Sequence, residues 1–222
     1  MDVRKIVNTL IEDIANGTSI NQILLKAQIV AFSVDDKRFS QLIKNEQQGY
    51  FANDEIPGYR KQKTMVKATF VDPFQNVQTA EVHSEVIEDK RIRDLMTYVY
   101  VKEPLIQLEQ MYENSENEML RMSVPAFAYP TIEALYPGYN VKVYSAYYCF
   151  PKESLLSIVE TFKAQLLDLL LQFDKELNWN IELTDEKNKE VVQSIINNVY
   201  HIHAVVANTG EGSVNTGDIK SL

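Results

Sequence analysis

Glu46 is the residue whose position points most directly to chemistry. Apolar side chains at residues 39–43 mark the inner face of a helix expected over about 35–48, and Glu46 continues that face. A carboxylate on a buried face needs a partner, and Arg60 follows fourteen residues later. Glu46 could be an acid or base with a shifted pKa. We favour a structural Glu46–Arg60 ion pair, because no second catalytic group is visible nearby.

The structural interpretation covers the whole stretch NEQQGYFANDEIPGYR, residues 45–60. A glycine directly after the last helical residues is typical of a helix end, and a Pro-Gly pair is typical of a turn. Two tyrosines would pack around the buried pair. The expected structural signature consists of Glu46, Gly49, Tyr50, Pro57, Tyr59 and Arg60.

A catalytic alternative needs several carboxylates that converge on one place. A toxic metal-dependent nuclease or nucleotide hydrolase could use Glu46, Asp54, Glu55 and His83. A second possible metal site comes from His201 and His203, which alternate on an expected strand and would point to one face. No third ligand is obvious, so we favour a solvated or core-edge histidine pair, and we expect no metal and no cofactor.

The single cysteine and the many tyrosines have simple structural explanations. Cys149 excludes an intrachain disulfide, and without a basic neighbour to lower its pKa it is expected to be a core residue. The tyrosines could instead line a small-ligand groove, which would make the protein a ligand sensor, or they could line an interface. Packing of a central strand explains them more simply. This tyrosine run consists of Tyr136, Tyr139, Tyr144, Tyr147 and Tyr148.

Composition predicts a soluble cytoplasmic protein. The 222 residues are 45% apolar, which is enough for a sizeable core, and the apolar runs are too short and too charged to span a bilayer. Acidic residues interrupt the first apolar stretch, so no signal peptide is expected. The net charge of −9 disfavours nucleic-acid binding, although basic patches exist at residues 60–67 and 90–93.

The pattern of apolar residues predicts an α+β fold. Three helices come first, over residues 2–16, after a Ser19–Gln22 capping box, and over about 35–48. Strands at 60–71 and 77–87 would form a hairpin around the turn at 72–76. The expected architecture is an N-terminal helical bundle, a small antiparallel sheet and long C-terminal core helices.

The second half contains the longest predicted element. A helix begins near Pro104, residues 114–139 are mostly irregular or short helices, and residues 141–150 form a central strand. Helices follow over 152–177 and from Thr184 to about Val199, and HIHAVVA before the tail is β-like. One domain is expected over residues 1–207, and residues 208–222 form a Gly- and Asn-rich tail or linker.

The helix over 152–177 has apolar residues on more than one face, which predicts either a central position in the core or packing on two sides, for example against another subunit. We therefore expect a homo-oligomer, and we expect Leu170 to be exposed, so that a charge there would give a monomer. The expected interface contains Leu156, Leu167, Leu170 and Leu171.

Several motifs together resemble a known family. These are NEQQGY (45–50), EIPGYR (55–60), the helical run ESLLSIVETFKAQLLDLLLQFDKEL (153–177), TDEK (184–187) and IINNVY (195–200) before a glycine-rich tail. In this order the chain resembles the AbiTii domain of bacterial abortive-infection proteins. The resemblance covers nearly the whole chain, and Phe162-Lys163 stands where the family's long helix usually carries an arginine.

The resemblance implies a bacterial origin and a role in anti-phage defence, with no catalytic residues. It also implies a position near the N-terminus of longer proteins. We therefore expect a module without its own chemistry that associates with itself or senses a phage or host protein. The toxic enzyme and the small-ligand sensor remain the alternatives.

Overall fold

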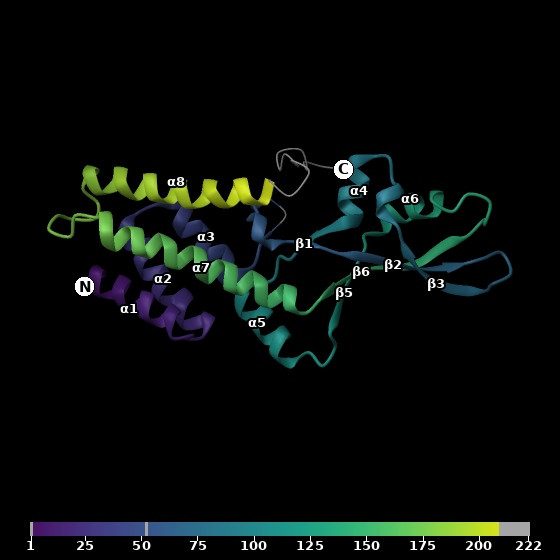
Figure 1. Ribbon diagram of the computed structural model, residues 1–222, viewed down its shortest axis with the longest axis horizontal. Helices are drawn as coiled ribbons and strands as arrows, with labels where there is room; N and C mark the ends of the chain where they lie inside the picture. Colours follow the sequence, from purple (N-terminus) through teal and green to yellow (C-terminus); the bar gives the residue numbers. More distant parts are fainter. Residues whose placement is uncertain (1, 52, 209–222) are drawn as a thin grey trace. The chain divides into compact units, whose positions relative to one another are not determined.

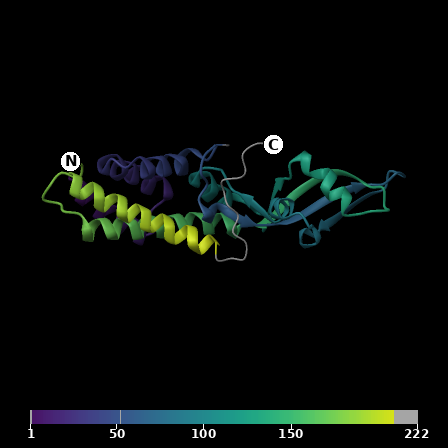
Figure 2. The same cartoon turned by 90° about the horizontal axis from the view of Figure 1, so that it is seen from above.

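The structure, a computed structural model, describes residues 2–51 and 53–208 (Figures 1 and 2). Its described residues contain α-helices and small antiparallel sheets, so the predicted α+β class is confirmed. Helices begin and end the described chain, and the strands lie between them in sequence. The expected tail begins where the description ends, and its residues 209–222 lie outside the described residues.

The chain folds into two compact units. The first contains the chain up to Tyr59, Lys102–Gln110 and the chain from Ser157, and the second contains Arg60–Val101 and Met111–Leu156. The segments of each unit are therefore discontinuous in sequence. The expectation of one domain over residues 1–207 stays a prediction.

Three antiparallel helices begin the first unit: α1 (Val3–Ala15), α2 (Ile20–Val34) and α3 (Lys37–Gln48). Asp2 caps α1 and Asp36 caps α3, each by accepting a backbone N–H of the first turn. Ser19 is the N-cap residue of α2 but makes no side-chain capping hydrogen bond, so the predicted capping box does not form. The three predicted helices are confirmed.

Two long helices complete the first unit, α7 (Glu153–Glu176) and α8 (Glu186–Asn208), and α8 runs back alongside α7 in both views (Figures 1 and 2). The rings of Phe39 and Phe173 meet edge to face, with centroids 6.2 Å apart, and join α3 to α7. The side chains that α7 and its end bury follow the predicted steps of three and four. They are Leu155, Ile158, Val159, Phe162, Leu166, Leu169, Leu170, Phe173 and Leu177.

A buried asparagine organises the connection between α7 and α8. Asn188 accepts the backbone N–H of Asn178 at 2.9 Å and donates its amide to the carbonyls of Asn178 and Glu182. All of these bonds satisfy a polar side chain that has almost no contact with solvent.

The expected strand HIHAVVA is wrong, because α8 continues to Asn208 without an interruption.

The second unit contains two antiparallel sheets. One pairs β1 (Lys61–Lys63) with β4 (Tyr98–Tyr100), and the other has the strand order β3-β2-β6-β5. The larger sheet consists of β2 (Met65–Val71), β3 (Val77–Val82), β5 (Met119–Ser123) and β6 (Lys142–Pro151). The hairpin of β2 and β3 and the central position of β6 confirm two predictions.

One face of the larger sheet carries the core of the second unit. Helices α4 (Lys90–Thr97) and α6 (Tyr129–Ala134) lie on this side (Figure 1). The Tyr148 hydroxyl donates to the Leu95 carbonyl at 2.9 Å, and the Tyr136 ring packs on Phe70 with centroids 4.8 Å apart. The buried side chains of this face are Val66, Ala68, Phe70, Val82, Ala146 and Tyr148.

Short elements change three of the predicted boundaries. The expected strand 60–71 is divided into the 3-10 turn Gly58–Arg60, β1 and β2, and the expected strand 77–87 ends at Val82, before the turn Ser84–Val86. Strand β5 lies in a region predicted to be mostly irregular, which also contains the 3-10 turn Ala126–Ala128. Helix α5 (Leu105–Asn114) begins after Pro104 as expected.

Candidate functional site

The carboxylate of Glu46 is the centre of a buried hydrogen-bond cluster in the first unit. Its side chain has no exposed surface, although it lies on the last turn of α3. The hydroxyl of Tyr59 donates to Glu46 Oε1 at 2.6 Å, and the hydroxyl of Tyr50 donates to the same oxygen. Two phenols therefore replace the water that an exposed carboxylate would bind.

Gly49 ends α3 in a conformation that favours glycine, with φ at +85°. Its N–H donates to the Asn45 carbonyl at 2.8 Å, and the next N–H, from Tyr50, donates to the Lys102 carbonyl at 2.8 Å. A Cβ on Gly49 would lie only 2.8 Å from that same carbonyl oxygen. The absence of a side chain thus lets the segment at Lys102 approach the end of α3.

Arg60 is fully buried at the end of the turn Gly58–Arg60 in the second unit. Its guanidinium donates to the Val101 carbonyl at 2.9 Å, and the Val101 N–H donates back to the Arg60 carbonyl at 2.9 Å. Glu46 belongs to the first unit and Arg60 to the second. The ion pair that the sequence predicts between them stays a prediction. Pro57 is partly buried just before this turn.

Of the other predicted catalytic residues, Asp54 and His83 have local partners. The Asp54 carboxylate accepts the Phe51 N–H at 2.7 Å, and Glu55 is exposed in the same loop. His83 lies in the second unit, where its Nδ1 is 3.3 Å from a carboxylate oxygen of Glu85 on the surface. Among the described residues, no group of three or more His, Cys, Asp or Glu side chains could hold a metal ion.

The histidine pair and Cys149 fall on elements of different kinds. His201 and His203 lie in α8, so the alternation that a strand would give them does not apply. Cys149 is buried in β6, where the sequence places it.

The tyrosine run divides between core and surface. Tyr148 is buried and Tyr136 is partly buried against Phe70, whereas Tyr139, Tyr144 and Tyr147 are exposed. The run therefore lines no common groove among the described side chains, although the exposed members remain available to a partner.

A shallow polar hollow of about 470 Å³ lies beside α6 and β6. Its central ion pair joins Glu133 to Lys142 at 2.9 Å, and Glu133 also accepts the Val143 N–H at 2.9 Å. The hydrogen bond from Lys142, followed by that from Val143, lowers the pKa of Glu133. The hollow is lined by Pro130, Glu133, Ala134, Tyr136, Gly138, Asn140, Val141 and Lys142.

The interface expected on α7 needs a correction. Leu170 has no exposed surface, so the expectation that it is exposed is wrong, and its side chain belongs to the core of the first unit. Leu171, by contrast, is 50% exposed, and Leu156 and Leu167 are partly buried. Of the four residues expected at the interface, one is thus buried, two are partly buried and one is exposed, and the interface itself stays a prediction.

A more exposed apolar face lies on α2. Leu25, Ile29 and Phe32 are 53%, 37% and 83% exposed. Steps of four and three place them in one row along the helix. We call this row the α2 stripe. The sequence shows the same spacing, but the buried positions dominate the apolar pattern of α2.

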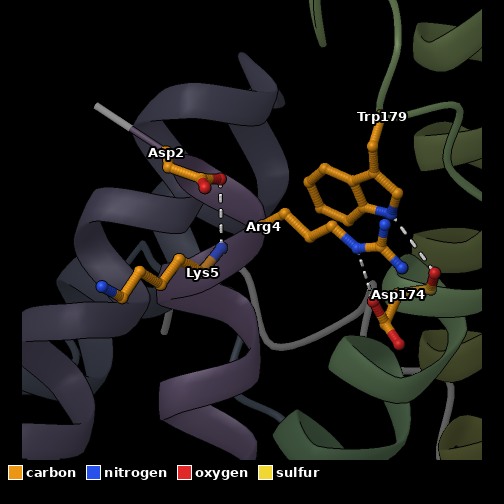
Figure 3. A network of polar contacts seen from close by, with 5 residues as sticks. All are labelled: Asp2, Arg4, Lys5, Asp174 and Trp179. Atoms are coloured by element: carbon orange, nitrogen blue, oxygen red, sulfur yellow. Dashed lines mark hydrogen bonds and ion pairs between the residues drawn. The ribbon is translucent and has the colours of Figure 1, made fainter.

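Figure 3 shows a polar network that the sequence did not predict. Arg4 of α1 lies 3.3 Å from the Asp174 carboxylate and 5.7 Å from the centre of the Trp179 ring. The Trp179 indole donates to the Asp174 carbonyl at 3.2 Å. The network joins the first helix to the end of α7, and its exposure makes it a small contributor to stability.

None of the helices in the described part of the chain combines the length and the apolar character needed to cross a membrane.

A comparison with protein families finds that the AbiTii family model matches residues 5–198. Neither the curated proteins nor the solved structures gave a significant match.

The match extends from α1 into α8 and includes the Glu46 cluster, Gly49 and the α2 stripe. It therefore covers most of both compact units. The chain belongs to the AbiTii family, the abortive-infection domain of bacterial anti-phage defence.

Proposed function

We propose that this module serves abortive infection by associating with a second copy of itself through the α2 stripe, without chemistry of its own. The observation that carries the proposal is the row of three exposed apolar side chains on one face of α2. Contiguous apolar groups of this kind mark interaction sites on soluble proteins.

The charge distribution supports a second copy as the occupant. Two chains of net charge −9 repel each other over most of their surfaces. Helix α2 carries one charged residue, Lys26, and its ammonium pairs with Asp13 of α1. A contact centred on α2 therefore brings no unpaired like charges together.

The geometry suits a two-fold contact, in which the same row of each copy faces the other. Three side chains can form only the apolar centre of an interface, because stable interfaces bury about 800 Å² on each partner. Association through the α2 stripe would therefore depend on concentration or on a further contact. Such a contact could come from a phage or host protein in the cytoplasm, and it would turn association into a signal.

The Glu46 cluster supports the absence of chemistry. A carboxylate that accepts two phenolic hydroxyls and has no exposed surface is placed to hold the end of α3. A general base must instead come within hydrogen-bond reach of a substrate proton. We therefore assign Glu46 a structural role.

A phage-plating assay with the full-length gene tests the proposal. Phe32→Glu should abolish protection while the protein accumulates at the normal level, because a charge in the α2 stripe repels its counterpart. Phe127→Glu is the matched control, since Phe127 is 70% exposed in the second unit and should tolerate the charge. Full protection by Phe32→Glu would contradict the proposal.

A further inference from the structure

The larger sheet of the second unit has a second face that α4 and α6 do not cover (Figure 1). Strand residues that alternate with the buried ones point to this side. On β2 they include Lys67 and Thr69, on β3 Thr79 and Glu81, and on β5 Arg121 and Ser123. All six are exposed or partly exposed, and we call this side the open face.

Tyr147 occupies the centre of the open face. It is 36% exposed on β6, a central strand, and its register partners are Lys67 on β2 and Ser123 on β5. Side chains directly opposite each other on antiparallel strands lie about 5 Å apart. Arg121 is one diagonal step away, because it pairs with Cys149. An aromatic ring is thus flanked by two cations.

Tyr144 is a second exposed tyrosine on the same strand. The pairing of β2 with β6 shifts between Thr69 and Phe70, so that Thr69 pairs with Ser145 and Phe70 with Val143. Tyr144 is the extra residue of this bulge, and it is 77% exposed. The bulge interrupts the alternation of β6 at this exposed tyrosine, three residues before Tyr147.

The charge of the second unit differs from that of the whole chain. The unit contains ten Lys and Arg residues against eleven Asp and Glu, which leaves it nearly neutral, while the remaining residues carry most of the net charge of −9. On the open face, Lys67 and Arg121 stand against one carboxylate, Glu81. The local excess is therefore positive, and the acidity of the chain as a whole does not describe this surface.

We propose that the open face binds single-stranded RNA, with bases stacked on Tyr144 and Tyr147 and backbone phosphates on Lys67 and Arg121. Antiparallel sheets with exposed aromatic side chains on central strands suit unstacked bases, and neighbouring cations neutralise the phosphates. The Ser123 hydroxyl can donate to or accept from a 2′-hydroxyl. The hydroxyls of Thr69 and Thr79 bond each other at 3.0 Å and keep lone pairs that can accept from a 2′-hydroxyl, so these groups favour RNA. The proposal uses no residue of the α2 stripe and stands independently of self-association.

Fluorescence anisotropy with a labelled single-stranded RNA, titrated with the full chain, tests the proposal. Tyr144→Ala and Tyr147→Ala should each weaken binding about tenfold or more, since stacking on one base contributes about 1–3 kcal/mol. Tyr139→Ala is the matched control, because Tyr139 is an exposed tyrosine that precedes β6. It should leave the affinity unchanged.

Salt titration separates phosphate contacts from other effects. Two phosphate contacts predict a slope of about −1.4 for log affinity against log salt, and Lys67→Gln should reduce its magnitude by about 0.7. The same oligonucleotide as DNA, or as an RNA duplex, should bind more weakly.

Four results would overturn the proposal. The first is no binding at protein concentrations up to about 100 µM, the weak end of non-specific affinities. The second is unchanged binding in both tyrosine variants, and the third is equal binding of DNA or duplex. The fourth is a loss of self-association in Tyr147→Ala, which would identify the open face as a protein interface. The light-scattering mass of the Phe32→Glu variant tests self-association separately.

Discussion

Tyr59 donates its hydroxyl to Glu46 over 2.6 Å, and the two residues are thirteen positions apart in the chain. The bond joins the last turn of α3 to the segment after the Pro57-Gly58 turn. The Tyr50 hydroxyl donates to the same oxygen of Glu46. In the segment between the two tyrosines, the Phe51 N–H donates to the Asp54 carboxylate, and the Tyr50 N–H donates to the Lys102 carbonyl. These bonds connect Glu46 with Tyr50 and Tyr59, and the structural role expected for the whole signature stays a prediction.

Removal of the Glu46 carboxylate should destabilise the first unit. In Glu46→Ala both phenolic donors lose a buried charged acceptor, and we expect a loss of about 3 kcal/mol in the free energy of unfolding. Glu46→Gln keeps an acceptor oxygen and should lose less. Denaturant unfolding measures the change, with the exposed Lys44→Ala on the same helix as the control. A Glu46→Ala variant as stable as Lys44→Ala would contradict the structural role.

A methyl group at Gly49 should be costly for two separate reasons. Backbone with φ at +85° strains any other residue, and the new Cβ would lie 2.8 Å from the Lys102 carbonyl oxygen. We expect Gly49→Ala to lower the free energy of unfolding by roughly 3 kcal/mol. Gly17 has φ at +70° and nothing within 4 Å, so Gly17→Ala reports the backbone cost alone, about 1 kcal/mol. Equal effects of the two substitutions would show that the close approach is unimportant.

Much of this site could be predicted from local sequence. The position of Glu46 on the apolar face of α3 indicated burial, and the glycine indicated the helix end. The contact of Gly49 with Lys102 could not be predicted, because the two residues are far apart in the chain and no sequence pattern links them. The burial of Asn188 could not be predicted either, although its partners Asn178 and Glu182 are only ten and six positions away, because an asparagine shows no apolar pattern that indicates burial.

Leu170 and Leu171 are adjacent on α7, but they should respond differently to truncation. Leu170 is fully buried, so Leu170→Ala should destabilise the protein by about 2–5 kcal/mol through lost contacts and a cavity. Leu171 is half exposed, and Leu171→Ala should cost less than about 1 kcal/mol. Thermal unfolding of the two variants measures the difference. A large effect of Leu171→Ala at unchanged oligomeric mass would contradict the burial seen on α7.

Because of Tyr148, we expect the folded protein to lose stability at alkaline pH. Burial raises the pKa of its hydroxyl from 10.0 to about 12. The folded state therefore keeps the proton when the unfolded chain has lost it. The contribution of the Tyr148 hydroxyl to the free energy of unfolding is therefore complete below pH 10, and it is lost as the pH rises from about 10 to about 12.

Tyr148→Phe should remove this alkaline component, and it should also lose the hydrogen bond to the Leu95 carbonyl, about 1 kcal/mol at neutral pH. The measurement is unfolding at a series of alkaline pH values. The exposed Tyr139→Phe is the control and should keep the alkaline loss. The same alkaline profile in Tyr148→Phe and the unsubstituted chain would exclude Tyr148 as its source.

The secondary structure could be predicted where the apolar residues of a segment repeat with one clear spacing. Apolar residues spaced three and four positions apart predicted α7, and the alternation of apolar and polar residues predicted β2 and the hairpin. Strand β5 was missed because its partner, β6, supplies the pairing that its short sequence does not indicate. The histidine-containing end of α8 was misassigned, because β-branched residues there favour strands in isolation while the continuing helix decides otherwise.

The solution mass of the purified chain tests the central claim of self-association. Light scattering over a concentration series should show a rise to at least twice the 25.5 kDa of one chain. Phe32→Glu should stay at the mass of one chain throughout, and Phe127→Glu should behave like the unsubstituted protein. A monomer at every concentration in all three proteins would contradict association through the α2 stripe.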